Sequence, residues 1–251
     1  MSPQPGDRDD WNRHWDDYAS SAESNPAQRF RRQLILGSLA LHQAASTPRV
    51  LDIGSGQGDF AVDVLAACPG AQVLGLELSA SGVAIAARKA PAARFLQCDL
   101  TQAQEPPESH RGWATYAVCS EVLEHLDDPQ LLLVNAKAWM APDCRLIVTV
   151  PGGPMSAFDR HIGHRKHYAP EELRCLLEGA GYRVERASGA GWPFFDLYRC
   201  VVIARGSRLI DDVSRGPSPA ARIAMGVFDG LFRLNLRSRG WQTFAIARYE
   251  R

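Results

Sequence analysis

The chain has 251 residues, of which 45% are hydrophobic and 22% charged, and its 28 basic side chains balance 28 acidic ones. This composition is typical of a globular protein with one large domain, and zero net charge gives no reason to bind long nucleic acid. The six cysteines form no CxxC pair, so we interpret them as reduced thiols of a cytoplasmic protein. We expect no leader peptide, and no apolar run approaches the roughly 20 residues of a membrane-spanning helix.

The first 47 residues predict helices. We expect residues 1–9 to be disordered, while Trp11, Trp15 and Tyr18 recur at the spacing of one helical face. A second helical segment begins near Pro26. We therefore expect residues 10–47 to form an N-terminal helical region.

Residues 48–191 alternate between strand and helix patterns. The strands are apolar at consecutive positions, as in "RVLDI", "AQVLGLE" and "CRLIVTV", which is typical of a parallel sheet covered on both faces. We predict an α/β fold with a doubly wound, mostly parallel sheet. Residues 48–191 would form its cofactor-binding core.

A long, locally basic insert separates the last two predicted strands. We interpret residues 192–240 as a helical substrate cap and residues 241–251 as the final strand. An apolar helical face is predicted from Ile223, Val227, Phe228, Leu231 and Leu234. Plain packing of this helix onto the domain, or contact of the insert with a membrane surface or a lipid substrate, are the alternatives.

The stretch "RVLDIGSGQGDFA", residues 49–61, places glycines at 54, 56 and 58 between a strand and a helix. Glycines let the backbone turn tightly and let a ligand approach its N–H groups. Glu77 ends the next strand, where a carboxylate can accept both hydroxyls of a ribose, and Asp99 ends the third. The third glycine of the dinucleotide fingerprint is replaced by Asp59, and we expect no second domain for a hydride acceptor. An NAD-dependent oxidoreductase is therefore only an alternative.

Four motifs in this order, "VLDIGSGQGDFA", "LGLELS", "FLQCDL" and "CSEVLEHLDDP", resemble those of class I S-adenosylmethionine-dependent methyltransferases of the type-11 group. The resemblance covers about residues 10–190 and the final strand, and it implies S-adenosyl-L-methionine as the cofactor. It implies that Asp52, Gly54, Gly56 and Gly58 hold the methionine part, Glu77 the ribose and Asp99 with Leu100 the adenine, and that Cys119 and Ser120 flank the sulfonium. It also implies that residues 10–47 form an N-terminal helical lid, and that the Rossmann-like sheet has seven strands with an antiparallel last strand. The implied cofactor-binding residues are Asp52, Gly54, Ser55, Gly56, Gly58, Glu77, Leu78, Asp99, Leu100, Cys119, Ser120 and Tyr18.

Methyl transfer to a hydroxyl needs a general base with a pKa near the working pH, for which histidine is well suited. The candidate catalytic residues are His164 and His125. Glu121, Glu124 and His125 have the spacing of one helical face and could hold a divalent metal together with His164. Small-RNA 2′-O-methyltransferases show the same spacing, and ubiquinone-pathway O-methyltransferases resemble it. We favour no metal here and keep it as an alternative, beside a direct histidine base or a purely orienting role.

The acceptor is narrowed by what the sequence lacks. No Asn/Asp-Pro-Pro-Tyr/Phe stretch is present, which argues against transfer to a planar amide or exocyclic amine. Aromatic residues of the insert, Trp192, Phe194, Phe195 and Tyr198, suggest the walls of an apolar pocket. We expect methylation of an oxygen on a small hydrophobic or aromatic metabolite. The alternatives are a catalytically silent cofactor-binding subunit and a metal-assisted RNA 2′-O-methyltransferase.

Overall fold

One seven-stranded sheet forms the centre of the protein, with the strand order β3-β2-β1-β4-β5-β7-β6. The computed structural model describes residue 11, residues 25–206 and residues 219–250. Its strands are β1 (Arg49–Ile53), β2 (Gln72–Glu77), β3 (Arg94–Gln97), β4 (Ala114–Ser120), β5 (Met140–Pro151), β6 (Tyr182–Ala190) and β7 (Gln242–Tyr249). All pairings are parallel except those of β7, which runs antiparallel to both β5 and β6. The predicted fold class is confirmed.

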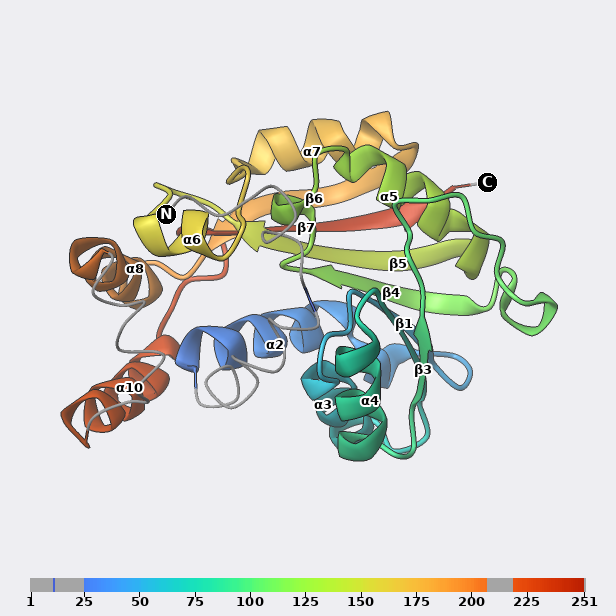
Figure 1. Ribbon diagram of the computed structural model, residues 1–251, viewed down its shortest axis with the longest axis horizontal. Helices are drawn as coiled ribbons and strands as arrows, with labels where there is room; N and C mark the ends of the chain where they lie inside the picture. Colours follow the sequence, from blue (N-terminus) through green and yellow to red (C-terminus); the bar gives the residue numbers. More distant parts are fainter. Residues whose placement is uncertain (1–10, 12–24, 207–218, 251) are drawn as a thin grey trace.

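Helices cover both faces of the sheet (Figure 1). One face carries α2 (Pro26–Leu39), α3 (Asp59–Ala67) and α4 (Ala80–Lys89), and the other carries α5 (Pro129–Ala136) and α7 (Pro170–Gly179). Neighbouring residues of β1 show why apolar side chains stand at consecutive positions in this strand. Val50 packs in the cluster that contains residues of α2 and α3, whereas Leu51 packs in the cluster that contains residues of α5 and α7. Because side chains alternate across a strand, coverage of both faces requires apolar residues at consecutive positions.

Short polar residues fix where the helices begin. The Asn25 side chain accepts the N–H of Ala27, with Pro26 as the first residue of α2. At the start of α6 (Ala157–His161), Ser156 and Asp159 form a reciprocal capping box. Ser156 Oγ accepts the Asp159 N–H at 3.1 Å, and the Asp159 carboxylate accepts the Ser156 N–H at 2.7 Å. This capping box fixes the position of the Asp159 side chain, which borders the functional site.

The segment predicted as a lid, residues 10–47, is only partly described. Residues 1–9, Trp15 and Tyr18 lie outside the described residues. The α2 helix is not a free lid, because its apolar side lies in the core, where its large buried residues are Phe30, Leu34, Ile35 and Leu39. Of the predicted lid, Trp11 is the residue that the structure places near the candidate site.

The insert contributes α8 (Phe194–Arg205) and α10 (Pro219–Phe232), which lie beyond the sheet at the end where β5 finishes (Figure 1, left). On the apolar face predicted for this segment, Ile223 and Val227 of α10 are 72% and 56% exposed, as is Leu234 just after the helix at 67%, so these three side chains are not packed onto the domain. The helix packs instead through Phe228 and Phe232, whose rings contact Tyr198 of α8. Among the described residues, no helix combines the length and the apolar character needed to cross a membrane.

Candidate functional site

The glycine-rich loop, residues 54–58, turns from β1 into α3 at the carboxyl end of the parallel strands. Gly54 has a φ of 70° and Gly58 a φ of 82°, in the left-handed region that favours glycine. A Cβ at Gly54 would collide with the Val122 side chain, and one at Gly58 would lie 2.9 Å from Ala86 Cβ. Larger residues therefore do not fit at these two positions, and the loop keeps its backbone close to its neighbours.

Glu77, at the end of β2, holds this loop in place. Its Oε2 accepts the Gly56 N–H at 2.8 Å, and its Oε1 accepts the Ser79 N–H at 2.9 Å. The side chain is buried yet lines the cavity beside the loop. Because each carboxylate oxygen can accept more than one hydrogen bond, Glu77 fits the ribose role predicted for it.

That cavity lies at the carboxyl ends of β1, β2, β3 and β4. Five residues predicted to bind the cofactor line it together, namely Gly54, Glu77, Leu78, Asp99 and Leu100. Thr101, Val122 and Leu126 also line it and were missed in the sequence. Their position in the sequence could have identified them, because they follow closely after the ends of β3 and β4, where ligands of such sheets bind.

Asp99 has a structural task as well as a place at the cavity. Its Oδ1 accepts the N–H of Thr101 at 2.9 Å and the Thr101 hydroxyl at 2.6 Å. Its Oδ2 accepts the Gln102 side-chain amide at 2.9 Å. These bonds close the loop after β3, so part of the acceptor capacity of this carboxylate is already in use.

Seven of the twelve predicted cofactor residues are not among those lining the cavity. Asp52, Gly56 and Gly58 are three of them, and the other four are placed as follows. Cys119 is fully buried within β4, and Ser120 Oγ lies 2.8 Å from Thr149 Oγ1 of β5. Ser55 is buried in the glycine loop, and Tyr18 lies outside the described residues. Beyond the end of β4, the chain reaches the cavity through Glu121 and Val122 instead of Cys119 and Ser120.

Asp52, in β1, is buried directly behind the loop. Its Oδ2 has no hydrogen-bond partner among the described residues. Burial, and then the charge of Glu77, raises the pKa of Asp52 to about 7. A carboxyl held at this pKa ionises readily when a positive charge such as an ammonium group is bound beside it. This property suits the predicted role of Asp52 with the methionine part of the cofactor.

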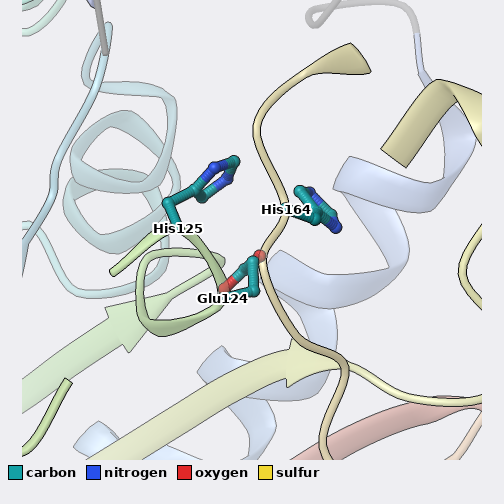
Figure 2. A group of neighbouring side chains, drawn as sticks. All are labelled: Glu124, His125 and His164. Atoms are coloured by element: carbon teal, nitrogen blue, oxygen red, sulfur yellow. The ribbon is translucent and has the colours of Figure 1, made fainter. Parts of the chain in front are cut away.

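A second group of polar side chains borders the cavity. Glu124 and His125 come from the short turn η3 (Leu123–His125), and His164 comes from the loop after α6 (Figure 2). One oxygen or nitrogen atom from each lies within 4.8 Å of the other two. The ring of His125 packs edge-on against Trp11 and against His164, with centroids 4.8 Å and 4.7 Å apart. His125 also lines the cavity, so the two predicted catalytic histidines meet at its edge.

Glu121 does not join this group. Its predicted helical alignment with Glu124 and His125 is wrong, because Glu121 has a φ of 56° and precedes a turn of only three residues. The Glu121 carboxylate instead accepts the Gln242 side-chain amide at 2.9 Å and lies 3.5 Å from the Arg31 guanidinium. The alternative metal set of four residues therefore contains three that converge.

Hydrogen bonds fix the proton positions on two histidines. His167 Nδ1 lies 3.1 Å from the Gly153 carbonyl oxygen, which only accepts, so Nδ1 carries the hydrogen. Burial lowers the pKa of His167, so its ring is neutral and its Nε2 is an acceptor. His164 Nδ1, 3.1 Å from that Nε2, is then the donor. Burial lowers the pKa of His164 to about 3, which leaves a neutral ring with its lone pair on Nε2.

An ion pair from the insert supports the two histidines. Asp159 accepts two hydrogen bonds from Arg199 of α8, at 2.7 Å and 3.2 Å. Burial alone would raise the pKa of Asp159, but the hydrogen bonds and charge of Arg199 outweigh it and lower the pKa to about 2. The carboxylate lies 3.8 Å from His167 Nε2. Contacts therefore run without a break from α8 through Asp159 and His167 to His164.

A larger cavity, of about 270 Å³, opens at the opposite ends of the strands. Its two lining arginines, Arg145 and Arg248, both form ion pairs with Glu185. None of the predicted site residues lines it. The smaller cavity beside the glycine loop is therefore the candidate site.

Known proteins resemble this chain in sequence. A family model described as a methyltransferase domain matches residues 27–187, well over half of the chain. Among curated proteins, the demethylmenaquinone methyltransferase of Thermus thermophilus is 40% identical over 135 residues, which cover 52% of this chain and 58% of that protein. The chain spans between 20% and 58% of the length of the curated relatives that it matches.

Solved structures share the fold at low sequence identity. Phosphoethanolamine N-methyltransferase 2 of Haemonchus contortus, in complex with S-adenosyl-L-methionine, aligns with a TM-score of 0.58 and 16% identity, over 88% of this chain and 52% of that chain. Geranyl diphosphate C-methyltransferase of Streptomyces coelicolor, in complex with Mg²⁺, geranyl diphosphate and S-adenosyl-L-homocysteine, aligns with a TM-score of 0.56 and 16% identity, over 89% and 79%. At 16% sequence identity, these structures show that the fold is shared and nothing more.

Proposed function

Because the chain belongs to the methyltransferase-domain family and has the class I S-adenosylmethionine-dependent fold, we propose that it transfers a methyl group from S-adenosyl-L-methionine to a small-molecule acceptor. The acceptor atom in this proposal is an oxygen of a hydrophobic or aromatic metabolite. When bound, the cofactor supplies a methyl carbon activated by the positive charge of its sulfonium.

The residues around the cavity fit this cofactor. Glu77 has acceptor capacity for a ribose diol at the end of β2, and Asp52 offers a carboxyl poised to ionise beside an ammonium group. The glycine loop leaves no side chain between its backbone and the cavity at Gly54. Leu100 and Asp99 stand together after β3, in the places proposed for an adenine ring and its amino group.

One observation carries the choice of an oxygen acceptor. His164 is neutral, its Nδ1 is occupied by His167, and its Nε2 holds the lone pair. Its ring lies against His125, which lines the cofactor cavity. A neutral nitrogen of this kind accepts a hydrogen bond from a hydroxyl, and the neighbouring Glu124, whose pKa is raised by burial, is the stronger base of the two. We assign the deprotonation of the acceptor to the group of Glu124, His125 and His164, and the alignment of donor and acceptor to the cavity walls.

The apolar character of the acceptor rests on the cavity and on the relatives. Leu126, Leu132 and Trp11 line the cavity, and two of the relatives act, by their names, on demethylmenaquinone and geranyl diphosphate. The aromatic residues of the insert contribute less than the sequence suggests. Phe195 is buried in the core against Phe30, and its role is structural.

Calorimetric titration tests the donor first. S-Adenosyl-L-homocysteine should bind the purified protein at micromolar concentration while NADH does not. Binding of NADH alone would favour the oxidoreductase alternative and contradict the proposal. This measurement needs no knowledge of the acceptor.

Product analysis tests the acceptor. Phenols, catechols and prenylated hydroquinones incubated with methyl-labelled cofactor should give an O-methyl product. His164→Ala should leave cofactor affinity unchanged and slow turnover, while His161→Ala, at an exposed side chain at the end of α6, should behave as wild type. A labelled C-methyl or N-methyl product would contradict the proposed oxygen acceptor and identify carbon or nitrogen as the acceptor atom. Tight cofactor binding without turnover on any of these or on short RNA would favour the silent subunit.

A further inference from the structure

Glu124 is an unusual carboxyl. Its side chain is fully buried, and neither carboxylate oxygen has a hydrogen-bond partner among the described residues. Burying a polar group without a hydrogen bond is costly, and burying a charge without a partner costs more. A carboxyl in this state points to a ligand that would satisfy it.

Two imidazoles surround this carboxyl from separate parts of the chain. His125 is its neighbour in η3, whereas His164 is brought in by the loop after α6 (Figure 2). The hydrogen bonds to His167 and Gly153 place the His164 hydrogen on Nδ1, so Nε2 presents a lone pair. Two imidazole nitrogens and one carboxylate form a known type of catalytic metal site.

We propose that Glu124, His125 and His164 bind a divalent transition-metal ion of the zinc class, with an open coordination position toward the cofactor cavity. Nitrogen donors favour zinc-class ions over Mg²⁺, which prefers oxygen ligands. Ligands of a tetrahedral zinc ion lie about 3.4 Å apart. The three donor atoms here lie within 4.8 Å of one another, so modest side-chain movements close the site.

The surrounding contacts match those of a metal ligand. A metal-bound histidine usually donates its other ring N–H to a fixed acceptor, which orients the ring. His164 makes this bond to His167, which is itself held by Gly153 and lies next to the Asp159–Arg199 ion pair.

Asp159, His164 and His167 form a neighbouring group of similar spacing, but it is a poorer site. Both oxygens of Asp159 already accept hydrogen bonds from Arg199, and Oδ2 also accepts one from Ser156. The Nε2 of His167 is engaged by His164. These groups are satisfied, whereas the Glu124 carboxyl is not.

The metal site deepens the proposed function and rests on it for its catalytic meaning. A hydroxyl that coordinates a zinc-class ion loses its proton at a lower pH and is held in one orientation. In that case His164 acts as a ligand, and the proton leaves to solvent or to a base of the substrate pocket. The acceptor oxygen would then reach the methyl carbon as an alkoxide or phenoxide.

Metal binding is tested without turnover. The full-length protein is stripped with a chelator and titrated with Co²⁺, whose visible absorption reports a nitrogen- and oxygen-coordinated site, and with Zn²⁺ in equilibrium dialysis. We expect one ion per chain. Glu124→Gln, which keeps the size of the side chain, and His164→Ala should each weaken binding by about 10-fold to 100-fold or more. His161→Ala is the matched control and should bind as wild type.

Several results would overturn the proposal. Wild-type protein that binds no ion would do so, as would equal affinity in Glu124→Gln and wild type. Loss of binding in Asp159→Asn with retention in Glu124→Gln would place the ion in the neighbouring group. Turnover by ion-free protein would remove the metal from catalysis and leave the histidine base, whereas ion binding without methyl transfer would leave the site standing and contradict the proposed function. Thermal unfolding of each variant confirms that it is folded.

Discussion

The two sides of the candidate site are built in different ways. The glycine-loop side uses backbone N–H groups and carboxylates at the ends of β1, β2 and β3, within a continuous stretch of about 50 residues. The histidine side joins η3 to a loop some 40 residues later and depends on Arg199 of the insert. A site made of strand ends is fixed by the sheet itself, whereas one made of loops depends on a few buried side chains.

Removing the ion pair under the histidine side should give the largest effect. Arg199→Met would leave the buried Asp159 carboxylate unpaired and lower the free energy of unfolding by about 3 to 5 kcal/mol. Urea denaturation measures this loss. Adding Asp159→Asn to the same chain should restore part of the stability, and a double variant no more stable than Arg199→Met would contradict the pairing.

The Asp52 carboxyl gives a pH dependence on the glycine-loop side. Its pKa is about 3.8 in an unfolded chain and about 7 in the fold, so the native state binds more protons between these values. The contribution of the protonated Asp52 carboxyl to the free energy of unfolding is then fully present below about pH 4, and it is lost as pH rises toward 7. Asp52→Asn should raise the free energy of unfolding of the cofactor-free protein at pH 8 by about 2 to 4 kcal/mol.

At pH 4 the same substitution should have little effect, because the native carboxyl is already neutral there. Cofactor affinity should fall in Asp52→Asn at both pH values. Chemical denaturation at the two pH values provides the measurement, and an equal change at both would show that titration of Asp52 is not the cause.

Glu77 and Asp99 divide the cofactor contacts unequally. Glu77→Ala removes the acceptor for two loop N–H groups as well as for the ribose, so affinity for S-adenosyl-L-homocysteine should fall by about 1 to 3 kcal/mol. Asp99→Ala should cost less, because part of its carboxylate serves Thr101 and Gln102. Calorimetry at constant pH ranks the two variants. Unchanged affinity in both would contradict the assignment of this cavity to the cofactor.

The exposed side of α10 should give the smallest effect. Ile223→Ser and Val227→Ser should change the free energy of unfolding by less than about 0.5 kcal/mol, because both side chains are mostly in solvent. Phe232→Ala, on the buried side of the same helix, is the matched control and should lose about 3 to 5 kcal/mol. A large loss in Ile223→Ser would mean that this surface is covered in solution.

The glycine-loop side was accessible from sequence because its signals are local. The order of strand, GxGxG, helix and acidic strand ends is written in consecutive residues, and parallel strands bring their carboxyl ends to one edge. Gly54, Glu77, Leu78, Asp99 and Leu100 therefore meet as predicted. Cys119 and Ser120 are less well placed, because the two residues after β4 reach the cavity in their stead.

The sequence by itself determined the mostly parallel sheet and the edge at which the candidate site lies, because strand and helix periodicity reflect burial on both faces, while the family resemblance implied the antiparallel last strand. Only the tertiary structure decided which polar residues converge. Glu121 leaves the histidine group through a positive φ and a bond to Gln242, 121 residues away, while His164 enters it through contacts with His167. The burial of α2 and the orientation of α10 were decided in the same way. Contacts between distant segments have no period in the sequence, and they arise only when the whole chain is packed.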